Sequence, residues 1–163
     1  MITTTLNRIH AHSLYQEGWE KLLNHLGKTK ADDEPLPFSL ILEINGLDYA
    51  LWCCRAEPQY EREWRLFAVA CARRVEHLNS DPRVKNAIDV AERYANGEAT
   101  SEELNTARDA TWDAAWAAKY AAYATWDAAG NVVGYDAWDA EREWQKQEFL
   151  RVVTETEQRL NSI

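Results

Sequence analysis

A six-residue sequence, Ala-Thr-Trp-Asp-Ala-Ala, occurs twice without change, at 110–115 and at 124–129. The copies begin fourteen residues apart, which is close to four turns of an α-helix, so both tryptophans return to nearly the same side of one helix. After its first four residues, the run 100–129 is almost entirely alanine, aromatic residues and aspartate. Alanine is the strongest helix former. The run therefore predicts one long helix, along which the remainder of the chain has to pack.

Large side chains follow a 4-3-4-3 spacing within this run, which is typical of a helix that packs along another helix. Each aromatic ring contributes at most about 4–6 kcal/mol when it is fully buried. Interior packing between alanine-lined helices is one interpretation of the stripe, and a partner-binding face is the other. The stripe consists of Trp112, Trp116, Lys119, Tyr123 and Trp126, with Lys119 as its one polar interruption.

Acidic residues accompany the aromatic stripe and continue beyond it. Residues 101–163 contain twelve Asp and Glu against six Lys and Arg, so this part carries two thirds of the net charge of −9. Such a face can dock on a basic protein surface, or it can simply be a solvated helix face. The candidate partner-binding residues are Asp109, Asp113, Asp127, Asp136, Asp139 and Glu143.

Helix signals dominate the other segments as well. Thr100 with Glu103 forms a capping box, Asp81-Pro82 starts a helix, and Gly27 ends one. A straight helix over 101–160 would be about 90 Å long, so we predict a corner at 130–134 and a final helix from about Tyr135 to Leu160.

Helical spacing also predicts apolar faces on two of these helices. In the helix over 60–78 the face consists of Trp64, Phe67, Ala68, Cys71, Val75 and Leu78, widened by Leu66, Val69 and Ala70. Arg73 and Arg74 near its end suit the negative pole of the helix dipole. In the final helix the inward candidates are Phe149, Val152, Val153 and Leu160.

No segment alternates as a strand would. The fold prediction is a single all-α domain over 1–163. It is a bundle of about six to eight helices, with short helices over 1–97 and a long alanine- and tryptophan-rich hairpin over 100–160.

Nothing in the sequence has the spacing of a catalytic or metal-binding motif. Cys53, Cys54 and Cys71 are an odd set without paired spacing, which favours a reduced, cytoplasmic setting. There is no glycine-rich phosphate loop and no HExxH pair. The apolar runs are too short to span a membrane, and the polar start is not that of a signal peptide. We therefore expect a non-enzymatic protein without cofactor or metal.

Three segments resemble a known group of bacterial and phage-borne proteins: 47–52 (LDYALW), 64–74 (WRLFAVACARR) and 91–100 (AERYANGEAT). The group is the alanine- and tryptophan-rich immunity proteins of the immunity-five-like type. The likeness covers roughly 47–149, and the AERYA segment and the WDAA repeats are its most specific parts. The resemblance implies an all-α protein that neutralises a toxin by binding it, without cofactor. It carries no binding residues over to particular positions.

The expected function is therefore that of an acidic inhibitor or immunity-type protein that binds and blocks a protein target. A phage anti-defence inhibitor, resembling an anti-CRISPR and occupying a nucleic-acid-binding groove, is an alternative. A homo-oligomeric structural protein is a second one. The expected partner is a basic toxin or host defence complex, with a homodimer also open. Direct binding to nucleic acid or to an anionic membrane is disfavoured by the charge of −9.

Overall fold

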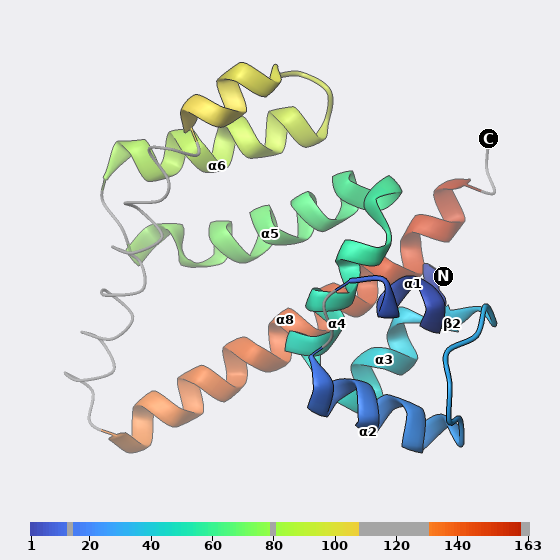
Figure 1. Ribbon diagram of the computed structural model, residues 1–163. Helices are drawn as coiled ribbons and strands as arrows, with labels where there is room; N and C mark the ends of the chain where they lie inside the picture. Colours follow the sequence, from blue (N-terminus) through green and yellow to red (C-terminus); the bar gives the residue numbers. More distant parts are fainter. Residues whose placement is uncertain (13–14, 79–80, 108–130, 161–163) are drawn as a thin grey trace. The chain divides into compact units, whose positions relative to one another are not determined.

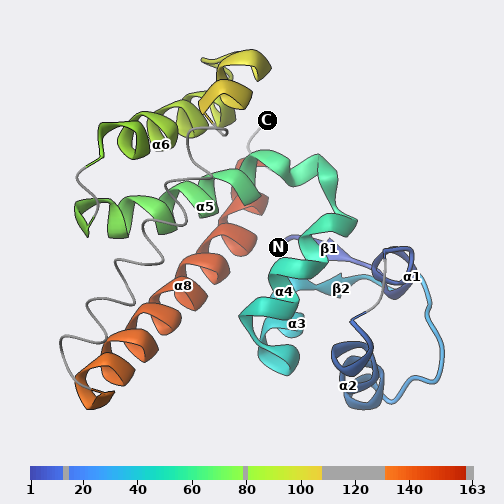
Figure 2. The same cartoon turned by 60° about the vertical axis from the view of Figure 1, so that its left-hand side comes forward.

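A computed structural model describes residues 1–12, 15–78, 81–107 and 131–160 of the chain (Figures 1 and 2). For residues 78, 131–138 and 156–160, only the backbone is described. The described part is all-α apart from one pair of two-residue strands, which confirms the predicted fold class. The chain divides into two compact units, Met1–Tyr60 with Gln145–Ile163 and Glu61–Trp144. That the whole chain forms a single domain stays a prediction.

The first unit is built from short helices joined by tight connections. Gly27, with φ 64°, ends α2 in the left-handed conformation predicted from the sequence. Gly46, with φ 82° and ψ 177°, separates α3 from α4 in a different positive-φ conformation, one that is accessible mainly to glycine. The helices are α1 (Leu6–His10), α2 (Gln16–Leu26), α3 (Phe38–Asn45) and α4 (Leu47–Cys53), followed by 3-10 turns at Cys54–Ala56 and Pro58–Tyr60.

Two short strands join the start of this unit to its middle. β1 (Thr3–Thr4) pairs antiparallel with β2 (Leu36–Pro37), so the expectation that the chain contains no strand was wrong. A strand of two residues is too short to show the period-two alternation by which strands are recognised in a sequence. Ile2 extends the connection, because its N–H donates to the Val153 carbonyl at 2.8 Å.

The core of the first unit surrounds two phenylalanines. Phe38 of α3 and Phe149 of α8 (Asn131–Leu160) meet edge to face with ring centroids 6.3 Å apart, and both side chains are fully buried. Val152 and Val153 are also buried, which confirms the inward face predicted for this part of the last helix. One carboxylate lies in this unit's interior: Glu57 is fully buried, and Arg8 pairs with it at 3.0 Å.

The second unit contains α5 (Glu61–Val75), a 3-10 turn at Glu76–Leu78, α6 (Pro82–Ala95) and a helical segment over 101–107. Helices α5 and α6 run side by side (Figures 1 and 2). Val69 packs with Val84 and Ile88 between them. The predicted inward face of α5 included Ala68, which is exposed instead. Phe67 and Val69 of the same predicted surface are buried, and α6 covers the side of α5 on which Val69 lies.

Helix α8 spans Asn131–Leu160 without interruption. Residues 131–134, predicted to form a corner, are therefore its first turn, and the prediction that the final helix starts at about Tyr135 was wrong. Gly134 is the weakest helix former among these four, but a single glycine costs only about 1 kcal/mol relative to alanine, and Asn and Val cost less. Gly130 and the predicted alanine- and tryptophan-rich helix, with its aromatic stripe, lie outside the described residues.

Candidate acidic interface on helix α8

The six predicted partner-binding residues fall into three groups. Asp109, Asp113 and Asp127 lie outside the described part of the chain. Asp136 is placed by its backbone within α8. Asp139 and Glu143 are described completely, and both are exposed. The structure thus places three of the six on one helix and two of them at its surface.

Helical geometry puts these three acids on one side of α8. At about 100° per residue, Asp136, Asp139 and Glu143 fall within an arc of roughly 60° around the axis. We call this set the α8 acidic face. Ala140 and Gln147, which border it, are exposed too. The face is therefore open to solvent over the part of α8 whose side chains are described.

Arg74 of α5 contacts the other side of the same helix. Its Nε donates to Oε2 of Glu141 at 2.5 Å, and its guanidinium lies 4.6 Å from the ring centroid of Trp144. Glu141 and Trp144 are centred about 140° around the axis from the α8 acidic face. The contact with α5 and the acids thus occupy nearly opposite sides of α8.

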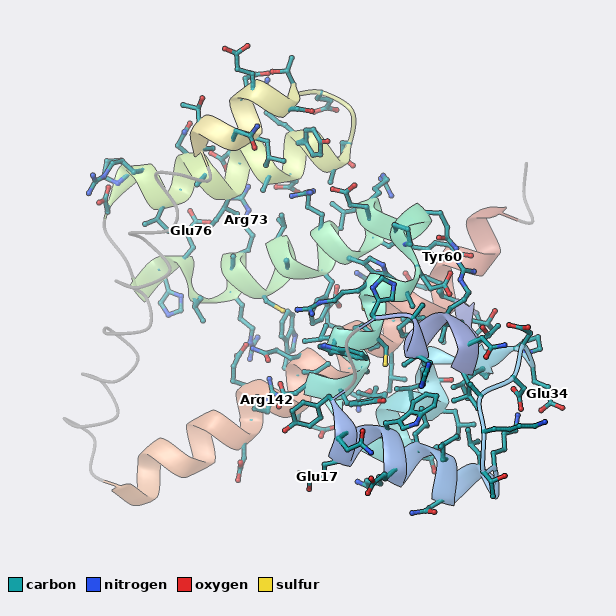
Figure 3. All side chains as sticks on the ribbon, viewed as in Figure 1. Glu17, Glu34, Tyr60, Arg73, Glu76 and Arg142 are labelled. Carbon is teal, nitrogen blue, oxygen red and sulfur yellow. The ribbon has the colours of Figure 1, made fainter. Side chains whose placement is uncertain are left out.

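A second arginine of α5 joins α5 to α6. Arg73 pairs with Glu92 at 2.7 Å, with Asp89 at 2.6 Å and with Glu76 at 3.0 Å, and it lies with Glu76 between the two helices (Figure 3). The hydrogen bond to Glu92 is the main reason that the pKa of Arg73 is raised above its ordinary value. Three carboxylates are therefore engaged by this one guanidinium inside the unit.

The remaining arginines of 61–107 are also engaged within the second unit. Their partners are carboxylates, an amide and an aromatic ring: Arg62 with Glu63 and Asn96, Arg65 with Glu61 and the Tyr94 ring, Arg83 with Asp81, and Arg93 with Glu103. The sequence of this unit holds sixteen Asp and Glu against ten Lys and Arg, a net of −6. The acids thus outnumber the bases, and part of this surplus lies at exposed residues such as Asp139.

The cysteines in this structure are buried or half-buried thiols. Burial raises the pKa of Cys53, and it raises the pKa of Cys54 to about 12. Both are therefore protonated at neutral pH and poor nucleophiles. Within the described ranges, no three His, Cys, Asp or Glu side chains are grouped so that they could hold a metal ion.

An open hollow of about 630 Å³ lies between α6 and the helical segment 101–107. Val90 and Ala107, which are buried, line it together with charged residues of both signs, Arg83, Glu102 and Glu103. This hollow has neither the single sign of charge nor the regular spacing of the α8 acidic face.

Sequence reasoning did not identify Arg74 as part of the site. Its place near the end of α5, beside Arg73, was explained by the helix dipole alone. Its carboxylate partner, Glu141, lies 67 residues further along the chain. No local signal in the sequence could have found this pair.

Comparisons of the chain with protein-family models, curated proteins and solved structures give no match. Among the helices described, none combines the length and the apolar character needed to cross a membrane.

Proposed function

We propose that this protein acts without catalysis, by binding a basic surface of another protein through the α8 acidic face and blocking that surface. One observation carries the proposal: Asp139 and Glu143 are exposed on the side of α8 that faces away from Arg74. Arg74 contacts one side of α8, and the exposed acids lie on nearly the opposite side.

The energetics of such a face favour several weak contacts over one strong contact. An exposed ion pair contributes about 0.2–1 kcal/mol, so one carboxylate cannot retain a partner. Complementary charge also raises the association rate and selects against acidic partners. A partner with Lys or Arg spaced over two helical turns would meet Asp136, Asp139 and Glu143 together.

The target class follows from the resemblance of the sequence to immunity proteins, which favours a bacterial toxin. Many toxins that act on nucleic acids present basic surfaces to their substrates, because phosphate binding requires positive charge. An acidic protein that covers such a surface would prevent substrate binding. A host defence complex with a basic nucleic-acid groove meets the same chemical requirement.

Charge reversal tests this proposal. The variant Asp139→Lys/Glu143→Lys shifts the formal charge from −9 to −5. The matched control Glu17→Lys/Glu43→Lys makes the same shift at exposed residues of α2 and α3. Each protein is immobilised, exposed to lysate of a cell that encodes toxins, and the retained proteins are quantified by mass spectrometry. We expect the wild type and the control to retain one or more basic proteins. The Asp139→Lys/Glu143→Lys variant should not retain them.

Identical retention by all three proteins would overturn the proposal. The identity of a selectively lost protein distinguishes a toxin from a defence complex. Binding of that protein is then repeated with purified components over a range of salt concentrations, because an interaction through exposed charges weakens as salt rises.

A further inference from the structure

One guanidinium makes two different contacts with α8. Arg74 donates to Glu141 and lies over the ring of Trp144, which is three residues further along the same helix. Residues at i and i+3 share a side of a helix. A rotation of α8 about its axis large enough to turn its acids inward would therefore break both contacts together. We call this arrangement the Arg74 clasp.

We infer that Arg74 is a positioning residue: the Arg74 clasp holds the N-terminal half of α8 with its acidic face outward, and partner binding depends on it although Arg74 itself touches no partner. The inference rests on the proposed function. A cation over an indole ring and a charge-assisted hydrogen bond are each modest at a partly exposed site. Because Arg74 makes both contacts on one side of α8, together they fix the rotation of this helix about its axis as well as its position.

The chain provides a matched control within the same helix. Arg65 of α5 makes the same pair of contacts as Arg74, with one carboxylate, Glu61, and one aromatic ring, Tyr94. The ring it contacts belongs to α6, however, so its removal has no direct effect on α8. Comparing variants at the two positions therefore separates the effect of losing the Arg74 clasp from the effect of removing any arginine from α5.

Hydrogen–deuterium exchange on the full-length chain measures the clasp directly. In Arg74→Gln we expect the amides of 139–144 to exchange roughly ten-fold faster than in the wild type, because local opening of this half of α8 becomes easier. In Arg65→Gln these amides keep the wild-type rate. Arg74→Lys keeps a cation near the ring and the carboxylate but loses the planar fork, so its exchange should be at most about three-fold faster. Retention of the target is measured with the same variants, and Arg74→Gln is expected to lose binding although Asp139 and Glu143 are unchanged.

Equal exchange in the wild type and Arg74→Gln overturns the inference, whatever the binding result. Faster exchange of the amides of 139–144 in Arg74→Gln with unchanged retention of the target also overturns it, because partner binding would then not depend on the clasp. A different pattern identifies failure of the proposed function: exchange responds to Arg74→Gln, but charge reversal at Asp139 and Glu143 leaves retention unchanged.

Discussion

Among Gly18, Gly27, Gly46 and Gly97, only Gly18 has no room for a side chain. Glycine is unfavourable inside a helix, yet Gly18 lies in the first turn of α2. A Cβ built at this position would lie 2.2 Å from two ring atoms of Tyr49. The Gly18 carbonyl also accepts a hydrogen bond from the side-chain amide of Asn45 at 2.7 Å. The glycine is therefore required by the close approach of α4 to α2 and not by backbone conformation.

We predict that Gly18→Ala lowers the free energy of unfolding by up to about 2 kcal/mol. Overpacking costs about 1–3 kcal/mol, and the gain in helix propensity, about 1 kcal/mol, offsets part of it. Urea denaturation followed by circular dichroism measures the change. The same substitution in a Tyr49→Val background removes the clash, so there it should be neutral or stabilising. A loss of equal size in both backgrounds would refute the steric explanation.

At the scale of elements, short-range side-chain contacts fix where helices begin. Thr100 and Glu103 form the predicted capping box: the Thr100 hydroxyl accepts from the Glu103 N–H at 3.1 Å, and the Glu103 carboxylate accepts from the Thr100 N–H at 2.7 Å. The Thr100 backbone bond is the main cause of the lowered pKa of Glu103. The helix that leads into the alanine-rich run starts at this point.

Thr100→Ala should therefore destabilise the protein by about 1 kcal/mol, since an N-cap hydroxyl is lost. Thr106 supplies a control on the same helical segment. Its hydroxyl only donates back to the Glu102 carbonyl at 2.9 Å, a bond that does not stabilise a helix. Thr106→Ala should leave the midpoint of thermal unfolding nearly unchanged. Equal shifts in the two variants would show that the cap does not determine the helix start.

We predict that the stability of the α6 start depends on pH through Asp81, its N-cap residue. The Arg83 side chain, and then the Arg83 backbone N–H, lower the pKa of Asp81 to about 2. Because this pKa is below that of a free aspartate, about 4, the ionised cap stabilises the fold fully above about pH 4 and loses this contribution as the pH falls toward 2. Carbon NMR of the Asp81 carboxyl group should show the low pKa. Asp81→Asn keeps a capping oxygen and should show a smaller loss of stability than the wild type between pH 4 and pH 2. A carboxyl that titrates near pH 4 would contradict the prediction.

These elements also show what could be predicted from the sequence. The capping box at Thr100, the start at Asp81-Pro82 and the stop at Gly27 are encoded within four neighbouring residues, and all three were predicted. Phe149, Val152 and Val153 were predicted from helical period alone to face inward, and all three are buried. The side chain of Leu160, predicted with them, lies outside the described part.

One failure is local, the corner predicted at 130–134, where α8 already begins at Asn131. What else the sequence did not predict involves residues that are distant along the chain. The pairing of β1 with β2, the fit of Tyr49 over Gly18 and the contact of Arg74 with Glu141 depend on which elements become neighbours. The exposed side chain of Ala68 has the same cause, because α6 determines which side of α5 is covered. For the candidate site, the sequence predicted the acids at Asp139 and Glu143 but not the arginine on the opposite side of α8.

At the scale of the whole molecule, negative charge bears on the choice between a binding protein and a self-assembling one. Two copies with a formal charge of −9 each repel one another, most strongly at low ionic strength. Two α8 acidic faces could pair with each other only against this repulsion. Under the proposed function, the negative charge that attracts a basic partner also causes copies of the protein to repel one another.

We therefore predict that the purified protein sediments as an 18.8 kDa monomer at low salt and remains one at moderate salt. Analytical ultracentrifugation over a range of protein concentrations measures this. Asp139→Lys/Glu143→Lys provides an internal comparison, because it reduces the repulsion and adds cations that can pair with acids of another copy. It should self-associate at least as readily as the wild type. A wild-type dimer that tightens as salt is lowered would mean that oppositely charged surfaces meet between copies, and it would favour a homo-oligomeric structural protein over an inhibitor.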